Sequence, residues 1–167
     1  HGPPLASQMG RGGAGMKILM VSANVVKSMY PVFPLGAAVV TQALRMAGHT
    51  VEFLDWLAEG RSAERLRERV LALQPELIAI SIRNIDNANS VCEERCLDEA
   101  AKVVALLRAA SPAPIVLGGA GFSLMPEAVL RRLDADYGIA GEGEQAMVEF
   151  VESFERRRPP RFTVARA

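Results

Sequence analysis

The chain has 167 residues, of which 50% are hydrophobic and 23% are charged, and its 19 basic residues balance 19 acidic ones. This length and composition are typical of one globular domain with a substantial core. The balanced charge gives no electrostatic basis for binding nucleic acid or an acidic membrane, and no apolar run approaches the ~20 residues of a membrane span. With no signal peptide recognisable at the N-terminus, we predict a cytoplasmic protein without nucleic-acid or membrane partners.

The two ends of the chain differ in composition from its middle. Residues 1–15 are rich in glycine, proline and serine, which predicts an unstructured lead or an expression remnant. A run of arginines and prolines follows residue 155 and cannot continue a helix, so residues 156–167 are expected to form a linker toward a C-terminal domain. We therefore expect one folded domain over residues 16–155, within a longer parent chain.

Short apolar runs alternate with amphipathic stretches between these ends. They predict strands over residues 17–22, 50–54, 77–82, 114–117 and 136–140, and helices over 35–47, 62–73, about 91–110, 126–133 and 144–155. Gly48 suits the position after the first helix, and Ser62 suits the N-cap of the second. Because each apolar strand is followed by a helix, we predict an α/β fold with a doubly wound, parallel five-stranded sheet. This Rossmann or flavodoxin-like sheet has the order 2-1-3-4-5 and lies between helices in three layers.

Two glycine clusters follow the fourth and fifth predicted strands directly. One comprises Gly118, Gly119, Ala120 and Gly121, and the other comprises Gly141, Glu142, Gly143 and Glu144. In open α/β folds ligands bind beyond the carboxyl ends of the strands. Because glycine lacks a Cβ, a flat and bulky ligand can approach the main chain there. We therefore predict a ligand site at this edge of the sheet.

The loops after the first and third strands contribute further candidates. The first loop runs to Gly36, longer than the ~2–6 residues usual for such loops, and the third carries four amide or carboxylate side chains over residues 83–90. The first loop has no glycine before Gly36, so neither a dinucleotide fingerprint nor a P-loop is present. Ser22, Asn24 and Ser28 are suited to hold the phosphate of FMN, and this flavodoxin-like alternative stays open.

The remaining reactive side chains favour structural roles. Cys92 and Cys96 lie four residues apart on a predicted helix, without further metal ligands nearby, and are expected to be partly buried. His49 is expected to be a surface residue in a turn at the opposite edge of the sheet. Trp56 suits the core, a domain interface or a ligand contact equally. We predict no catalytic residue and no metal ligand, so this fragment alone is not expected to be catalytic.

The order and spacing of six stretches resemble the N-terminal cobalamin-binding domain of cobalamin-dependent radical SAM enzymes. The stretches are 17–22, 30–36, 44–51, 80–82, 116–119 and 141–144. The resemblance implies that the chain binds cobalamin (vitamin B12) as a module of a larger enzyme, which transfers methyl groups or remodels a carbon skeleton. Its implied partner is the C-terminal radical SAM domain of the same parent chain. S-adenosylmethionine and an iron–sulfur cluster would bind only there, because Glu99 replaces the third cysteine of the Cys-x-x-x-Cys-x-x-Cys motif.

The family's functional residues can be carried over position by position. Ser81 would hydrogen-bond the nucleotide tail of cobalamin, as the serine of a Ser-x-Leu-type motif whose third position here is Arg83. Gly118 and Gly119 would let the tail pass beside the fourth strand. The loop from Tyr30 to Gly36 would lie under or beside the corrin, and the second glycine cluster near its rim. The predicted cofactor-binding set is Ser22, Asn24, Tyr30, Pro31, Ser81, Arg83, Asn84, Gly118, Gly119, Ala120, Gly141, Glu142, Gly143 and Glu144.

One family motif is absent from the first loop. Many cobalamin-binding domains carry Asp-x-His-x-x-Gly there, with a histidine that ligates cobalt, and this chain has no such histidine. The resemblance therefore implies a cobalt whose lower face has no histidine ligand. An FMN-binding or nucleotide-binding regulatory module remains the alternative function, and a degenerate domain that only packs against a partner is a third.

Overall fold

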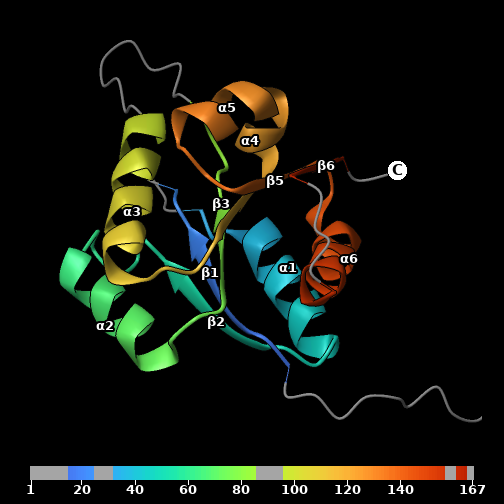
Figure 1. Cartoon of the computed structure of the whole chain (residues 1–167). Helices are drawn as coiled ribbons and strands as arrows, with labels where there is room; N and C mark the ends of the chain where they lie inside the picture. Colours follow the sequence, from blue (N-terminus) through green and yellow to red (C-terminus); the bar gives the residue numbers. More distant parts are fainter. Residues whose placement is uncertain (1–14, 25–31, 86–95, 157–160, 165–167) are drawn as a thin grey trace, which may run out of the picture.

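The computed structural model of the chain describes residues 15–24, 32–85, 96–156 and 161–164. Its elements are β1 (Lys17–Ser22), α1 (Leu35–Met46), β2 (Thr50–Asp55), α2 (Ala63–Leu73), β3 (Leu77–Ser81), α3 (Cys96–Ala110), β4 (Ile115–Gly118), α4 (Ala120–Leu124), α5 (Pro126–Arg132), β5 (Tyr137–Ala140), α6 (Gly143–Glu155) and β6 (Phe162–Val164). The strands form one parallel sheet in the order β2-β1-β3-β4-β5-β6 (Figure 1). Among the described helices, none is long and apolar enough to cross a membrane.

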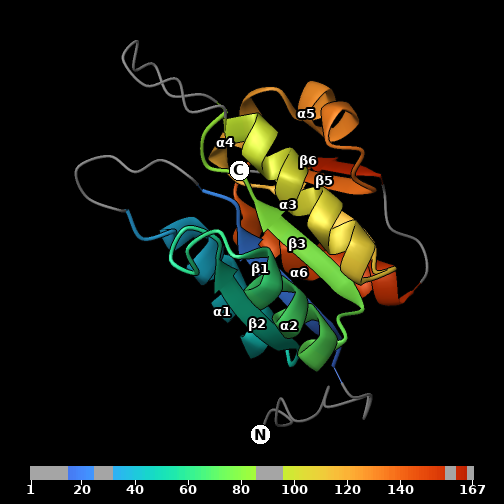
Figure 2. The same cartoon turned by 90° about the vertical axis from the view of Figure 1, so that its left-hand side faces the viewer.

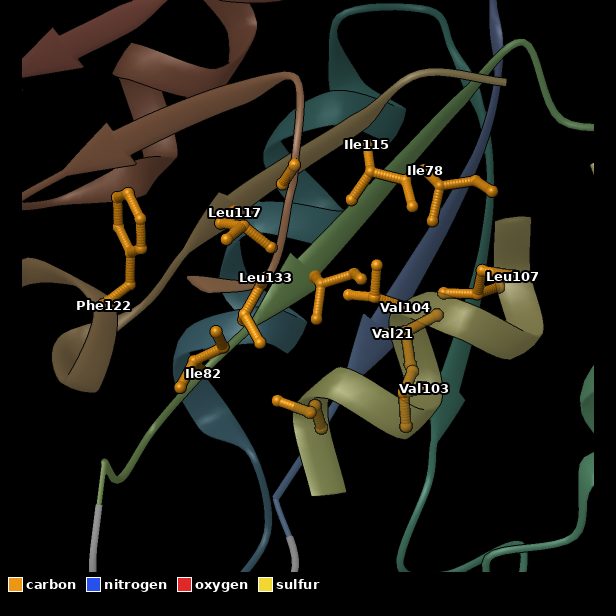
Figure 3. Close-up of a cluster of buried hydrophobic side chains, with 14 of the residues drawn as sticks. Val21, Ile78, Ile82, Val103, Val104, Leu107, Ile115, Leu117, Phe122 and Leu133 are labelled. Atoms are coloured by element: carbon orange, nitrogen blue, oxygen red, sulfur yellow. The ribbon is translucent and has the colours of Figure 1, made fainter. Parts of the chain in front are cut away.

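Helices cover both faces of the sheet, as the apolar strands require. Successive side chains of a strand point to opposite faces, so Ile18 and Met20 of β1 pack under α1 and α6, while Leu19 and Val21 pack on the other side. The second face is covered by α2, α3 and α5 (Figures 1 and 2). Figure 3 shows this second core, in which side chains of α3 lie against those of β1, β3 and β4. The predicted three-layer α/β fold is confirmed.

The sheet has one strand more than predicted. Residues 162–164 lie in the segment expected to be a linker, yet they form β6, which pairs in parallel with β5 (Gly138 with Phe162). The prediction of five strands is therefore wrong by one. β6 is only three residues long and follows an arginine-proline run, so it leaves no periodic pattern in the sequence.

Local details of the helices follow from single residues. Ser62 caps α2 as predicted, because its side chain accepts a hydrogen bond from the Arg65 backbone N–H at 3.3 Å. Gly48 ends the turn after α1 with a φ of 95°, a conformation that glycine adopts without strain. The short helix α4 was not predicted, because it begins inside the first glycine cluster, at residue 120. Of the predicted helix at 91–110, residues 91–95 lie outside the described part.

The expectation that His49 is a surface residue is wrong. It lies at the amino edge of the sheet, as predicted, but its side chain is only 6% exposed. Its Nδ1 accepts a hydrogen bond from the Met16 backbone N–H at 3.2 Å. The expected surface residue is therefore a buried structural one, which fastens the chain where β1 begins.

Candidate functional site

A cleft of about 650 Å³ opens at the carboxyl edge of the sheet, between the first turns of α1 and α6. This volume lies in the range of small-molecule sites. The lining residues come from four strand ends, from the loop before α1, and from both helices. They are Met20, Ser22, residues 32–37, Val40, residues 79–81, Arg83, residues 116–120, Ile139, residues 141–144 and Met147. The site predicted at this edge therefore exists as a cavity.

Strand register gives the floor of the cleft two layers. Ser22, Ser81 and Gly118 are neighbours on β1, β3 and β4. Because side chains alternate between faces, the residues two positions earlier share the same face. These are Met20, Ala79 and Val116, which are also in register with one another and line the same cleft. We call Ser22, Ser81 and Gly118 the outer layer, which is small and partly polar. We call Met20, Ala79 and Val116 the inner layer, which is apolar.

Helices α1 and α6 form two walls of the cleft and approach each other closely. A Cβ on Gly143, the first residue of α6, would lie 3.1 Å from Cγ2 of Val40 on α1. Val40 and Met147 extend the apolar inner layer upward from the floor. The first turn of α1 contains no acidic residue, and no described side chain caps its N-terminus. Its backbone N–H groups therefore give this wall a partial positive charge.

The two glycines after β4 serve different purposes. A Cβ on Gly118 would have one neighbour within 4 Å, the Ile139 carbonyl oxygen at 3.6 Å, so this glycine leaves the floor open toward the cleft. Gly119 has a φ of 98°, and a Cβ there would lie 2.6 Å from the Ile82 carbonyl oxygen and 2.9 Å from Ser81 Oγ. The close approach of β3 and the residue after it therefore requires a glycine at position 119, whichever ligand is bound.

A serine that sequence reasoning missed joins the two glycine clusters. Ser123 of α4 donates a hydrogen bond from its Oγ to the Gly119 carbonyl oxygen at 2.9 Å and accepts one from the Gly141 backbone N–H at 2.9 Å. The hydroxyl thus fixes the turn after β4 against the turn after β5. Its only signal in the sequence is its position four residues after Gly119, which carries no motif by itself.

The structure brings most of the predicted site residues together. Ten of them line the cleft: Ser22, Ser81, Arg83, Gly118, Gly119, Ala120, Gly141, Glu142, Gly143 and Glu144. Asn24 is buried and Asn84 is half-buried, and neither belongs to the lining. Tyr30, Pro31 and Ser28 lie outside the described residues. Sequence reasoning missed the inner layer, because methionine, alanine and valine in a strand look like ordinary core.

Two residues at the end of β2 have structural roles away from the cleft. Asp55 accepts a hydrogen bond at Oδ1 from the Leu57 backbone N–H at 3.1 Å, so its carboxylate closes a turn. Trp56 is 2% exposed, and its Nε1 donates to Glu99 Oε1 at 3.2 Å. Burial raises the pKa of Glu99, but hydrogen bonds from Lys102 and Trp56 outweigh this effect and hold the pKa below its ordinary value. Trp56 is thus a core residue.

The described residues offer no ligand set for a metal ion. They contain no group of three histidine, cysteine or carboxylate side chains placed to hold one. The chain has two histidines, His1 and His49. His49 lies at the amino edge, away from the cleft, and His1 lies outside the described part.

Comparison with known proteins identifies the family. The model of the B12 binding domain matches residues 21–151. The chain belongs to the B12-binding domain family. This assignment confirms the fold and the cofactor, cobalamin, that the resemblance implied.

The most informative relatives are much larger proteins. This B12-binding domain is 30% identical over 131 residues to tryptophan 2-C-methyltransferase of Streptomyces laurentii, covering 77% of this chain and 22% of that one. The radical S-adenosylmethionine methyltransferase TsrM of Kitasatospora setae, solved with cobalamin and a [4Fe-4S] cluster bound, matches with a TM-score of 0.79. It is 29% identical, over 86% of this chain and 25% of that one. The chain thus spans about a fifth to a quarter of the length of these relatives.

A more distant enzyme shares the fold alone. OxsB, a cobalamin-dependent S-adenosylmethionine radical enzyme solved with aqua-cobalamin bound, matches with a TM-score of 0.63 at 17% identity. The match covers 85% of this chain and 19% of that one. The matches to tryptophan 2-C-methyltransferase and TsrM, at 30% and 29% identity, make the B12-binding domain described here homologous to the corresponding domain of radical SAM methyltransferases.

Proposed function

We propose that the chain is the cobalamin-binding module of a larger radical SAM enzyme, most of whose length is a C-terminal radical SAM domain. The family match, together with a cleft at the carboxyl edge of the same sheet, carries this proposal. Residues 16–155 with β6 would form the module. The relatives that bear "methyltransferase" in their names favour methyl transfer over carbon-skeleton remodelling as the parent reaction.

The cleft fits one part of cobalamin. A volume of about 650 Å³ is too small for the corrin together with its side chains, but it accepts the slender nucleotide tail. Gly118 leaves room on the floor, and the Ser81 hydroxyl on the neighbouring strand would hydrogen-bond the tail. The uncapped first turn of α1, with Gly36 and Ala37 in the lining, suits the phosphodiester of the tail. The corrin would then lie over the mouth of the cleft.

The residues at the mouth favour a cobalamin that is held without a histidine ligand from the described part of the chain. When bound, cobalamin supplies a cobalt centre that accepts and donates a methyl group. Arg83 is exposed and lines the cleft, but a guanidinium carries only N–H donors and offers no lone pair for a metal. None of the described lining residues is a histidine. The chain's own residues would therefore orient the cofactor and leave its reactivity to the parent enzyme.

The FMN alternative has no support from the site. It depended on Ser22, Asn24 and Ser28, of which only Ser22 is placed in the cleft lining. Asn24 is buried outside the lining, and Ser28 lies outside the described residues.

Gly118 lies on the floor of the cleft, where a side chain would obstruct the nucleotide tail. Substitution Gly118→Val places two methyl groups on the floor of the cleft, where the tail would pass, so we expect hydroxocobalamin to bind about tenfold more weakly or worse. Gly118→Ala, whose Cβ meets only an ordinary contact at 3.6 Å, should bind with intermediate affinity. A titration followed by the visible spectrum measures both.

Two controls accompany this titration. Urea unfolding of each variant separates loss of binding from loss of the fold, and FMN is titrated in parallel. Gly119→Val does not serve the purpose, because it collides with the backbone of residue 82 and disturbs the fold itself. A folded Gly118→Val variant that binds hydroxocobalamin as tightly as the original chain would refute the proposed placement. Binding of FMN alone would refute the function.

A further inference from the structure

The inner layer of the cleft offers almost nothing to hydrogen-bond. Its side chains are those of Met20, Ala79, Val116, Val40 and Met147, all of which line the cleft. None of these side chains is a donor, and a methionine sulfur is only a weak acceptor. The polar lining side chains lie farther out, on Ser22, Ser81, Arg83 and the second glycine cluster. Polarity in the described lining therefore falls from the mouth inward.

The backbone groups of the floor do not compensate for this lack. On the floor, β1, β3 and β4 lie inside the sheet, and their main-chain groups pair with neighbouring strands. On α1, the hydroxyl of Thr41 lies outside the lining and donates to the Ala37 carbonyl oxygen at 2.8 Å. A ligand group that reaches the inner layer thus leaves water without gaining a polar partner from these elements.

Such a layer discriminates between ligand bases by their polarity. Cobalamin and its natural analogues differ in the lower base that ends the nucleotide tail. Dimethylbenzimidazole carries methyl groups and one unsubstituted ring nitrogen, whereas adenine carries an amine and additional ring nitrogens. Burying a polar group without a partner is unfavourable, whereas burying methyl groups is favourable.

We infer that the inner layer selects cobamides with an apolar, benzimidazole-type lower base and disfavours those with a purine base. This inference rests on the proposed function, because it requires the nucleotide tail to enter the cleft. Val116 on β4 and its neighbour Ala79 on β3 are the residues that set the preference. Their contribution is the absence of polar atoms, so a polar substitution of nearly equal size tests it directly.

The experiment compares three aquo-corrinoids by titration against the whole chain. They are cobalamin, the adenine-containing pseudocobalamin, and cobinamide, which has no nucleotide. Detaching the lower base from cobalt has a different free energy in each cobamide. This difference is a property of the ligand, so it cancels when the ratio of the two dissociation constants is compared between protein variants.

The decisive variant is Val116→Thr, which replaces one methyl group by a hydroxyl at the inner layer. We expect the ratio of the pseudocobalamin to the cobalamin dissociation constant to fall by about threefold to tenfold, because the hydroxyl gives a purine one hydrogen-bond partner. Val21→Thr is the matched control. Val21 is a fully buried valine of β1 whose side chain points to the other face of the sheet, so its variant should leave the ratio unchanged.

Each outcome decides the inference. Cobinamide that binds as tightly as cobalamin, or a ratio that Val116→Thr leaves unchanged, overturns it while the proposed function stands. Failure of the original chain to bind any of the three corrinoids contradicts the proposed function as well. Should Val116→Thr not fold, Ala79→Ser adds a hydroxyl on the adjacent strand, in register with Val116, and the same fall in the ratio is expected.

Discussion

At the scale of single residues, Ser123 links parts of the site that the sequence keeps apart. Ser123→Ala would remove both hydrogen bonds that join the turns after β4 and β5. We expect an unfolding free energy lower by about 1–2 kcal/mol and weaker cobalamin binding, because both glycine clusters line the cleft. Ser123→Thr keeps the hydroxyl and should restore the affinity. Unchanged affinity in the alanine variant would show that the turns hold their places without it.

The Glu99 carboxylate is expected to make the free energy of unfolding depend on pH in the acid range. Its pKa is held below the ordinary value in the folded chain by Lys102 and Trp56, against the effect of burial. A lowered folded pKa contributes stability that is present above the ordinary carboxyl pKa and is lost as the pH falls through the folded value. We expect Glu99→Gln to be less stable than the original chain near neutral pH, and this difference to shrink in the acid range, below about pH 4. Urea unfolding over a pH series measures it, and a constant difference would contradict the assignment.

At the scale of elements, β6 shows how a strand can form without a sequence signal. Phe162 packs against the core cluster on the α3 face, whereas Val164 is 62% exposed. We expect Phe162→Ala to lower the unfolding free energy by about 1–3 kcal/mol and Val164→Ala to change it by less than about 0.5 kcal/mol. Chemical denaturation of the two variants measures both effects. Equal effects would mean that β6 contributes backbone pairing alone.

The elements that sequence reasoning found share a strong periodic signal. The five predicted strands are apolar runs, and helices such as α2 show one apolar face and a recognisable cap at Ser62. β6 and α4 are three and five residues long, too short for a period to show. His49 was misplaced for a similar reason, because a turn residue gives no indication of which way its side chain points.

At the scale of the whole molecule, the outer and inner layers of the cleft differed in how well they could be predicted. Residues such as Ser81 and Gly118 stand directly at strand ends, where the parallel topology itself indicates a site. Val116 and Ala79 lie within strands. The alternation of faces predicts to which side of the sheet their side chains point, but not whether a helix covers them or a cleft exposes them. That depends on how closely α1 and α6 approach each other, a tertiary property.

The direction of β6 also determines how the module can be tethered. A parallel strand ends at the same edge as its neighbours, so the chain that leaves Val164 does so at the edge that holds the cleft, whereas β1 begins at the opposite edge. Anything joined after β6 starts at the edge of the sheet that holds the cleft, so a short connection gives it a high effective concentration at that edge. Anything joined before β1 starts on the far side of the sheet. An affinity tag or a fluorophore is therefore best attached at the N-terminal side, where it would leave the mouth accessible.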